Sequence, residues 1–157
     1  MKLKVKNFIK SNPLYYKLWF YINKSRLSRQ LKLPQKSDDY YFDGYPRNGN
    51  TYTRGLLNYI LPNKMGAHHL HVVAGIRIAH SNQIDPIIIV IRNPKDAILS
   101  NLYRKMYHSD SYVINNKVKL ILSDLIKEWL DYYYFVKEQN GIHLIFLEKL
   151  SRTKNLI

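Results

Sequence analysis

The sequence contains no cysteine. Disulfide bridges, catalysis by a thiolate and metal sites with cysteine ligands are therefore excluded. The sequence also lacks an apolar run of about 20 residues, the length that a helix needs to cross a bilayer. The first residues alternate lysine with apolar residues and do not form the continuous apolar stretch of a secretory signal peptide. We therefore expect a cytoplasmic protein.

Acidic residues are absent from residues 1–36, which carry ten of the 25 lysines and arginines and contribute most of the formal net charge of +14. We interpret residues 1–36 as a basic helical N-terminal arm that ends near Leu33 and Pro34, and residues 37–157 as one α/β domain. Such an arm could contact nucleic acid, anionic lipid or an acidic substrate, or could simply be a solvated basic helix. Nucleic acid is the least favoured partner because the arm has no signature of a known nucleic-acid-binding fold.

Leu14 to Ile22 is an aromatic and apolar stretch, interrupted only by Lys17. This stretch is too short to span a bilayer but could lie on a membrane surface as a peripheral contact. Leu14, Leu18 and Ile22 recur at helical spacing, which favours packing of this face against the domain.

Apolar patterns in the rest of the chain predict alternating strands and helices. Ile87 to Ile91 is an unbroken β-branched run between two prolines, typical of a strand that is covered on both faces in a parallel sheet. We expect the other strands at 39–45, 67–71 and 142–147, and helices at 51–61, 72–83 (interrupted by Gly75), 94–107 and 117–139, with Asn93 as an N-cap and Gly141 just past the last of these helices. This order predicts an α/β fold, a parallel β-sheet flanked by helices.

Two loops stand where an expected strand gives way to a helix. The first reads Tyr45-Pro46-Arg47-Asn48-Gly49-Asn50-Thr51-Tyr52, and the second reads Arg92-Asn93-Pro94-Lys95-Asp96-Ala97-Ile98-Leu99-Ser100. The start of a helix presents unpaired N–H groups and a positive dipole end to an anion. Ligands of parallel sheets bind beyond the carboxyl ends of the strands, so both loops should open on one edge. Together they predict a ligand with phosphate-like groups at two ends.

Residue types within the loops suit that ligand. Gly49 allows the backbone to turn and approach an anion closely, Arg47 supplies a permanent charge, and Thr51 offers a hydroxyl at the helix start. An ordinary turn would explain the first loop about as well, since it lacks the G-x-x-x-x-G-K-[ST] spacing. In the second loop, a charge on Arg92 at the end of a buried strand is costly unless it faces a ligand or pairs, for which Asp96 is the alternative partner.

The two loops resemble the nucleotide-binding motifs of PAPS-dependent sulfotransferases, where PAPS is 3′-phosphoadenosine 5′-phosphosulfate. Residues 46–52 are similar to the family's P-K-S-G-T-T-W loop and its P-R-S-G-N-T variant. Residues 92–96 with Ser100 match the family's R-N-P-K-D…S segment, and residues 145–150 resemble its later strand and Y-E-D-L turn. The resemblance covers residues 40–150 and implies a P-loop NTPase-like sulfotransferase fold. It also implies transfer of a sulfuryl group from PAPS, without a metal, to a hydroxyl or amine of a small-molecule or glycan acceptor.

The resemblance also implies a role for each matching position. Backbone N–H groups of residues 48–51 and the Thr51 hydroxyl would hold the 5′-phosphate, and Tyr52 replaces the tryptophan that stacks on adenine. Arg92 and Ser100 would bind the 3′-phosphate. Arg47 stands in place of a lysine and would stabilise the leaving oxygen by charge alone, because a guanidinium does not give up its proton.

The general base of the family is a histidine in a K-T-H element, and His71 matches it best, 21 residues before Arg92. His69 then takes the lysine position of that element, or becomes the base if the register is shifted by two residues. A histidine near neutral pKa suits deprotonation of an acceptor hydroxyl. These histidines could instead be polar residues at a strand end. They could also form a zinc site, but no cysteine or carboxylate nearby in the sequence completes one.

Two other functions remain open at the level of sequence. One is a P-loop-type kinase that uses ATP and magnesium, against which the missing G-K-[ST] counts. The other is a non-enzymatic basic module that binds nucleic acid or membrane. The family also has a further C-terminal part with a basic loop that closes over the 3′-phosphate, so we expect this chain, ending at Ile157, to be C-terminally short.

Overall fold

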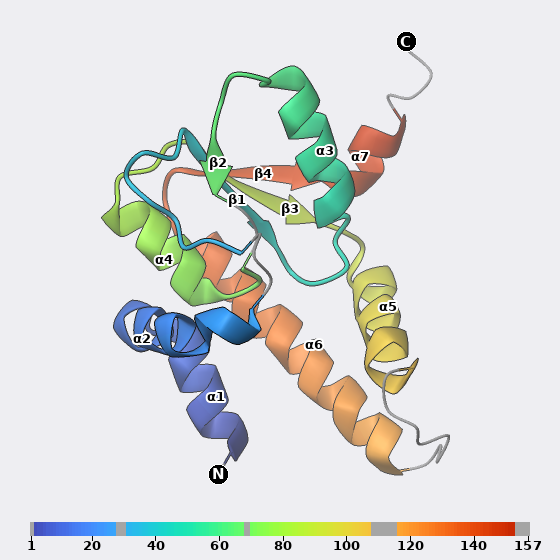
Figure 1. Cartoon of the computed structure of the whole chain (residues 1–157). Coiled ribbons are helices and arrows are strands. Elements are labelled where there is room, and N and C mark those ends of the chain that lie inside the picture. Colours follow the sequence, from blue (N-terminus) through green and yellow to red (C-terminus); the bar gives the residue numbers. More distant parts are fainter. Residues whose placement is uncertain (1, 28–30, 68–69, 108–115, 153–157) are drawn as a thin grey trace.

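A parallel sheet lies at the centre of the structure, a computed structural model that describes residues 2–27, 31–67, 70–107 and 116–152 (Figure 1). Its strands are β1 (Tyr40–Gly44), β2 (Gly66–Ala67), β3 (Ile87–Ile91) and β4 (Ile142–Phe146). The helices are α1 (Lys2–Ser11), α2 (Pro13–Asn23), the 3₁₀ turn η1 (Lys24–Arg26), α3 (Asn50–Ile60), α4 (Val73–Ser81), α5 (Pro94–Tyr107), α6 (Asn116–Lys137) and α7 (Leu147–Arg152). The predicted α/β class is confirmed.

The strand order is β2-β1-β3-β4, and every neighbouring pair is parallel. Strands β1 and β3 are therefore interior and adjacent, with Phe42 beside Ile88 and Gly44 beside Val90. The predicted central strand at 87–91 is confirmed as β3. Because paired parallel strands end at the same edge, the loops that follow β1 and β3 emerge side by side.

Helices cover both faces of the sheet, in agreement with the unbroken apolar run of β3. Tyr41, Ile87 and Ile89 pack with residues of α4 and α6 in one cluster. The alternate residues Phe42 and Ile88 pack on the other face, against α3 and the start of α7. Successive side chains of a strand point to opposite faces, so a strand covered on both sides needs apolar residues at every position.

Helix boundaries follow the local signals in the sequence. Asn93 caps α5, because its side-chain Oδ1 accepts a hydrogen bond from the N–H of Lys95 at 3.0 Å. Gly141 follows α6 with φ of 71°, the left-handed conformation that glycine adopts without strain. The Asn93 cap is confirmed, and Gly141 has the expected left-handed conformation, although α6 already ends at Lys137.

The N-terminal arm packs on the domain through a face other than the predicted one. Tyr16 and Phe20 of α2 are buried in a cluster with Leu70, Val72 and Ile78. The predicted packing residues Leu14, Leu18 and Ile22 are instead exposed. Helical spacing located an apolar face correctly, but α2 is apolar on both sides and the pattern could not decide between them.

The predicted extent of helical structure in the arm, up to Leu33 and Pro34, is also wrong. The chain breaks at Asn12, whose side chain accepts hydrogen bonds from the N–H groups of Leu14 and Tyr15 and caps α2, with Pro13 at the first helical position. Helical structure ends at Arg26, so residues 31–36 are not helical. Among the described helices, none is long and apolar enough to cross a membrane.

Gly75 does not interrupt α4, contrary to the sequence prediction. The helix runs from Val73 to Ser81, and Gly75 is a position of close approach. A Cβ at Gly75 would lie 2.3 Å from the hydroxyl oxygen of Tyr41, a residue that is fully buried. Gly55 in α3 has no atom within 4 Å of such a Cβ.

These two helical glycines should respond oppositely to alanine. Gly75→Ala is expected to lower the free energy of unfolding by about 1–3 kcal/mol, because the buried ring of Tyr41 cannot move aside. Gly55→Ala should raise it by up to about 1 kcal/mol through helix propensity alone. Urea denaturation of both variants measures the difference, and equal effects would contradict close packing at Gly75.

Candidate functional site

The loop between β1 and α3 makes a tight turn with two left-handed residues. Arg47 has φ of 72° and Gly49 has φ of 78°. Gly49 is the N-cap of α3 and has no side chain to cap the helix. Helix geometry leaves the first N–H groups of α3 outside the helical hydrogen-bond ladder, so this end of the helix is suited to an anion.

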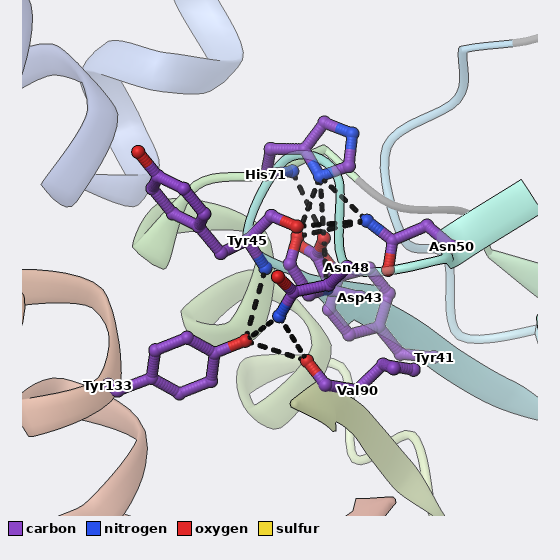
Figure 2. Close-up of polar contacts among 9 residues, drawn as sticks. Tyr41, Asp43, Tyr45, Asn48, Asn50, His71, Val90 and Tyr133 are labelled. Carbon is purple, nitrogen blue, oxygen red and sulfur yellow. Dashed lines mark hydrogen bonds and ion pairs between the residues drawn. The ribbon is translucent and has the colours of Figure 1, made fainter. Parts of the chain in front are cut away.

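The buried side chain of Asn48 attaches this loop to the rest of the domain. Its Nδ2 donates a hydrogen bond to the carbonyl oxygen of Val90 at 2.9 Å and another to the hydroxyl of Tyr133 (Figure 2). Tyr133 donates to the same carbonyl at 2.7 Å. The N–H of Asn48 donates to Tyr45 O within the turn. Asn48 therefore ties the loop to the end of β3 and to α6, rather than presenting its own N–H to the cavity.

Arg47 and Ser100 join the first loop directly to α5. The Nε of Arg47 donates to the Ser100 hydroxyl at 2.9 Å, and Arg92 donates from Nη1 to the backbone oxygen of Arg47 at 3.1 Å. The alternative pairing of Arg92 with Asp96 is not among the salt bridges of the described residues. Two segments 45 residues apart in the sequence thus form one cationic surface.

A cavity of about 500 Å³ opens above this surface. Most of the predicted site residues line it, together with one cation that the sequence prediction missed: Pro46, Arg47, Gly49, Asn50, Thr51, Tyr52, His71, Arg92 and Arg104. Arg104 lies four residues after Ser100, one helical turn further along α5, and its Nη2 donates to Asn101. With three arginines and the start of α3, the cavity is suited to a ligand that carries several negative charges.

Glu148 holds the second loop in place. Its Oε1 accepts a hydrogen bond from the backbone N–H of Asn93 at 2.7 Å. Glu148 is the acidic residue of the segment that resembles Y-E-D-L, and it lies in the first turn of α7. The three segments that carry the family resemblance therefore meet at one edge of the sheet.

His71 lies behind the first loop in a left-handed conformation, with φ of 58°. Its Nδ1 lies 2.6 Å from the carbonyl oxygen of Gly44. A carbonyl only accepts hydrogen bonds, so Nδ1 carries the proton and Nε2 holds the lone pair in the neutral ring. In Figure 2, Nε2 points away from Gly44, Asp43 and Asn50. The chain therefore prepares Nε2 to accept a proton.

Burial lowers the pKa of His71 below its ordinary value of 6.5, and the nearby charges of Arg104 and Lys10 lower it further. The hydrogen bond to Gly44 opposes these effects and raises the pKa. Since the net direction is downward, the imidazole is neutral at pH 7, which is the protonation state required of a general base.

Asp43 supports His71 and was missed by the sequence prediction. Its carboxylate is fully buried and accepts hydrogen bonds from the N–H of His71 at 3.1 Å, the N–H of Gly44 at 2.8 Å and the hydroxyl of Tyr41 at 2.5 Å. One carboxylate oxygen lies 3.6 Å from Nδ1 of His71. The sequence did contain a signal for Asp43: a charged residue inside the apolar strand 40–44 carries the same burial cost as Arg92.

A second cavity of about 440 Å³ lies on the other side of His71. Its walls come from α1, α4, α6 and the first loop and include Phe8, Tyr45, Val72, Tyr132 and Phe135. The first cavity is cationic, whereas this one is mainly apolar and aromatic. His71 and Pro46 line both cavities. The site thus has two compartments with a histidine between them.

The remaining predicted residues divide between cavity and interior. Thr51 and Tyr52 line the cationic cavity, and Tyr52 is exposed. Asn50 also lines it, and its Nδ2 donates to the carbonyl oxygens of Gly44 and Tyr45. His69 lies outside the described residues. Within the described part of the chain, no three His, Asp or Glu residues are grouped so that they could hold a metal ion.

Comparison with known proteins supports the fold. One similar solved structure is the mouse sulfotransferase SULT7A1 complexed with PAP, with a TM-score of 0.54 and 18% sequence identity over 74% of this chain and 54% of the mouse chain. The chain therefore spans about half the length of that protein. No family model and no curated protein matches the sequence. The chain has the α/β sulfotransferase fold that the motif resemblance implies.

The Tyr133 hydroxyl should be a measurable source of stability for the first loop. Tyr133→Phe removes the hydrogen bonds to Val90 O and Asn48 and is expected to lower the free energy of unfolding by about 1–2 kcal/mol. Tyr134→Phe, one residue along the same helix and exposed, is the matched control and should change it by less than about 0.5 kcal/mol. Urea denaturation of both variants gives the comparison, and equal effects would mean that the contact contributes nothing.

Proposed function

We propose that this protein binds PAPS in the cationic cavity and transfers its sulfuryl group to a hydroxyl or amine acceptor in the apolar cavity. The observation that carries this proposal is the position of His71. A histidine with a lone pair on Nε2 lines both cavities, one suited to a multiply charged anion and the other to an apolar molecule.

The cationic cavity fits a nucleotide with phosphates at two ends. The start of α3 and Arg47 would hold the 5′ end, where the phosphosulfate lies, and Arg92 with Ser100 would hold the 3′-phosphate. Arg104 adds a third cation to the same cavity. Tyr52, which lines the cavity, would stack on the adenine.

The donor supplies an activated sulfuryl group: a bond forms between sulfur and the acceptor oxygen or nitrogen while the bond from sulfur to the bridging phosphate oxygen breaks. Nε2 of His71 takes the proton that the acceptor loses. Arg47 stays charged and stabilises the negative charge that develops on the leaving oxygen. Asp43 fixes the backbone of His71 and places a negative charge near the imidazolium that forms.

The volume and the walls of the second cavity favour a small acceptor with a largely apolar body. Its walls are mostly apolar and aromatic, and its volume of about 440 Å³ is in the range of small-molecule sites. Lys10, Ser11, Arg77, Glu128 and Asp131 also line the cavity and would bind polar groups of the acceptor.

Calorimetric titration with 3′,5′-ADP tests the donor site. Wild-type protein is expected to bind without magnesium, and Arg92→Ala should weaken binding by about 2–4 kcal/mol, the cost of losing a charge-assisted contact in a partly buried site. Lys127→Ala, which removes an equal charge from the exposed surface of α6, is the control and should leave the affinity nearly unchanged.

The same titration separates the competing functions. Binding of ATP that requires magnesium, with no affinity for 3′,5′-ADP, would instead indicate a kinase. Equal affinities of Arg92→Ala and wild type would remove Arg92 from the site.

The assignment of His71 as the base predicts how kcat responds to substitution and to pH. In a sulfate-transfer assay, His71→Ala should reduce kcat by about 10²–10⁴-fold, the range for loss of a general base, while affinity for 3′,5′-ADP changes little. Because the pKa of His71 is lowered, the wild-type rate should be level above pH 7 and fall with a midpoint below 6.5, as Nε2 becomes protonated.

Two further variants control this prediction. His143→Ala, at an exposed position of β4, should leave turnover unchanged. If His69→Ala is more damaging than His71→Ala, the base is His69, although the reaction class stands. If neither substitution affects the rate, neither histidine accepts the proton that the acceptor loses.

A further inference from the structure

Helix α2 is apolar almost all round but is buried on one side only. Of its 11 residues, Pro13–Asn23, only Lys17 and Asn23 have strongly polar side chains. Tyr16 and Phe20 face the core that α2 shares with α4. A helix that is apolar on every side is normally covered on every side. Half of α2 therefore lacks a partner in the described part of the chain.

The uncovered half forms one continuous face. At 100° per residue, six exposed positions occupy a single arc on the side of α2 opposite Tyr16 and Phe20. They are Leu14 (72% exposed), Leu18 (58%), Ile22 (71%), Tyr21 (63%), Tyr15 (48%) and Trp19 (37%). Such a large exposed apolar patch marks an interaction surface.

The face continues onto α1. Val5 and Phe8 are also exposed, and the rings of Phe8 and Tyr15 lie 5.1 Å apart. Figure 1 shows α1 and α2 together on the outer side of α4, away from the sheet. We name the exposed residues Val5, Phe8, Leu14, Tyr15, Leu18, Trp19, Tyr21 and Ile22 the arm face.

Positive charge surrounds the arm face. Lys17 lies at the edge of its arc, and Lys24 and Arg26 are exposed directly after α2. No acidic residue occurs anywhere in residues 1–36, which hold ten lysines and arginines. An apolar face bordered by basic residues is the composition of a helix that lies on an anionic membrane.

We propose that the arm face docks on an anionic lipid surface, with α2 lying in the plane of the membrane interface. The helix is about 16 Å long and cannot span a bilayer, but it can bury one side among the lipid chains. Tyr15, Trp19 and Tyr21 have apolar rings with polar tips, the side chains that prefer the headgroup level. The neighbouring lysines contact the anionic headgroups.

Charge and polarity disfavour the other occupants. A second copy of this chain would bring two basic arms without acidic residues into contact, and these would repel each other. Nucleic acid would satisfy the lysines and arginines but would leave the leucines and isoleucine in water. Of these three occupants, the anionic lipid surface is the one that offers both apolar contacts and negative charge.

Co-sedimentation of the full chain with vesicles tests the proposal. Wild-type protein should bind vesicles that contain about 30% phosphatidylserine, and bind purely phosphatidylcholine vesicles much more weakly. The triple variant Leu14→Ser, Leu18→Ser, Ile22→Ser should lose about tenfold or more in vesicle affinity. The matched control Ile60→Ser with Leu120→Ser replaces equally exposed apolar residues on α3 and α6 and should bind like wild type.

Other outcomes overturn the proposal. Equal vesicle binding by the triple variant and wild type would show that charge alone acts and that the arm face is not in the membrane. Absence of wild-type binding to either vesicle would exclude a lipid surface. In that case, concentration-dependent dimerisation that the triple variant abolishes would assign the face to a second copy. Binding of an RNA oligonucleotide by both proteins would assign the arm to nucleic acid. Circular dichroism of each variant confirms that the fold is retained.

Discussion

The parallel pairing of β1 with β3 is the constraint on which the site depends. This register places Gly44 beside Val90, so the loops that follow the two strands begin as neighbours. Hydrogen bonds from Asn48 and Tyr133 to the carbonyl oxygen of Val90 then fix the first loop against the second strand. With the loops held in this way, Arg47 bonds to Ser100, and the start of α3 lines the same cavity as Arg92 and Arg104. The cationic surface is thus a consequence of strand order rather than of any single residue.

Patterns among neighbouring residues predicted the helices, strands and loops. Contacts between residues far apart in the sequence could not be predicted. The β-branched run at 87–91, the Asn93 cap and the glycine after α6 are each decided by residues close in sequence, and each prediction was confirmed. The role of Gly75 depends on Tyr41, and that of Tyr133 depends on Asn48, a residue 85 positions away. Periodicity likewise could not tell which side of α2 faces the core, because both sides are apolar.

Asp43 and Gly44 hold His71 in the state that its proposed role as a base requires. The carbonyl of Gly44 selects the tautomer with a lone pair on Nε2, and burial keeps that ring neutral. The Asp43 carboxylate holds His71 in a left-handed conformation that a non-glycine residue does not adopt without support. The orientation of the ring, its tautomer and its counter-charge therefore come from the end of a single buried strand. The same carboxylate is satisfied by Tyr41, which lies under Gly75, so the packing of α4 and the geometry of the base are linked.

Helix α1 connects the two proposals. Phe8 belongs to the exposed arm face, and the same residue, with Lys10 and Ser11, forms a wall of the apolar cavity beside His71. If the arm face lies on a membrane, the mouth of this cavity lies near the lipid interface. Apolar alcohols concentrate at that interface and could then reach Nε2 of His71 with little exposure to bulk water. The charged nucleotide of the proposed reaction has no such preference and would enter from the opposite compartment, where the three arginines lie. Under the two proposals, an apolar acceptor and an anionic donor enter separately, in agreement with the contrasting walls of the two cavities on either side of one histidine.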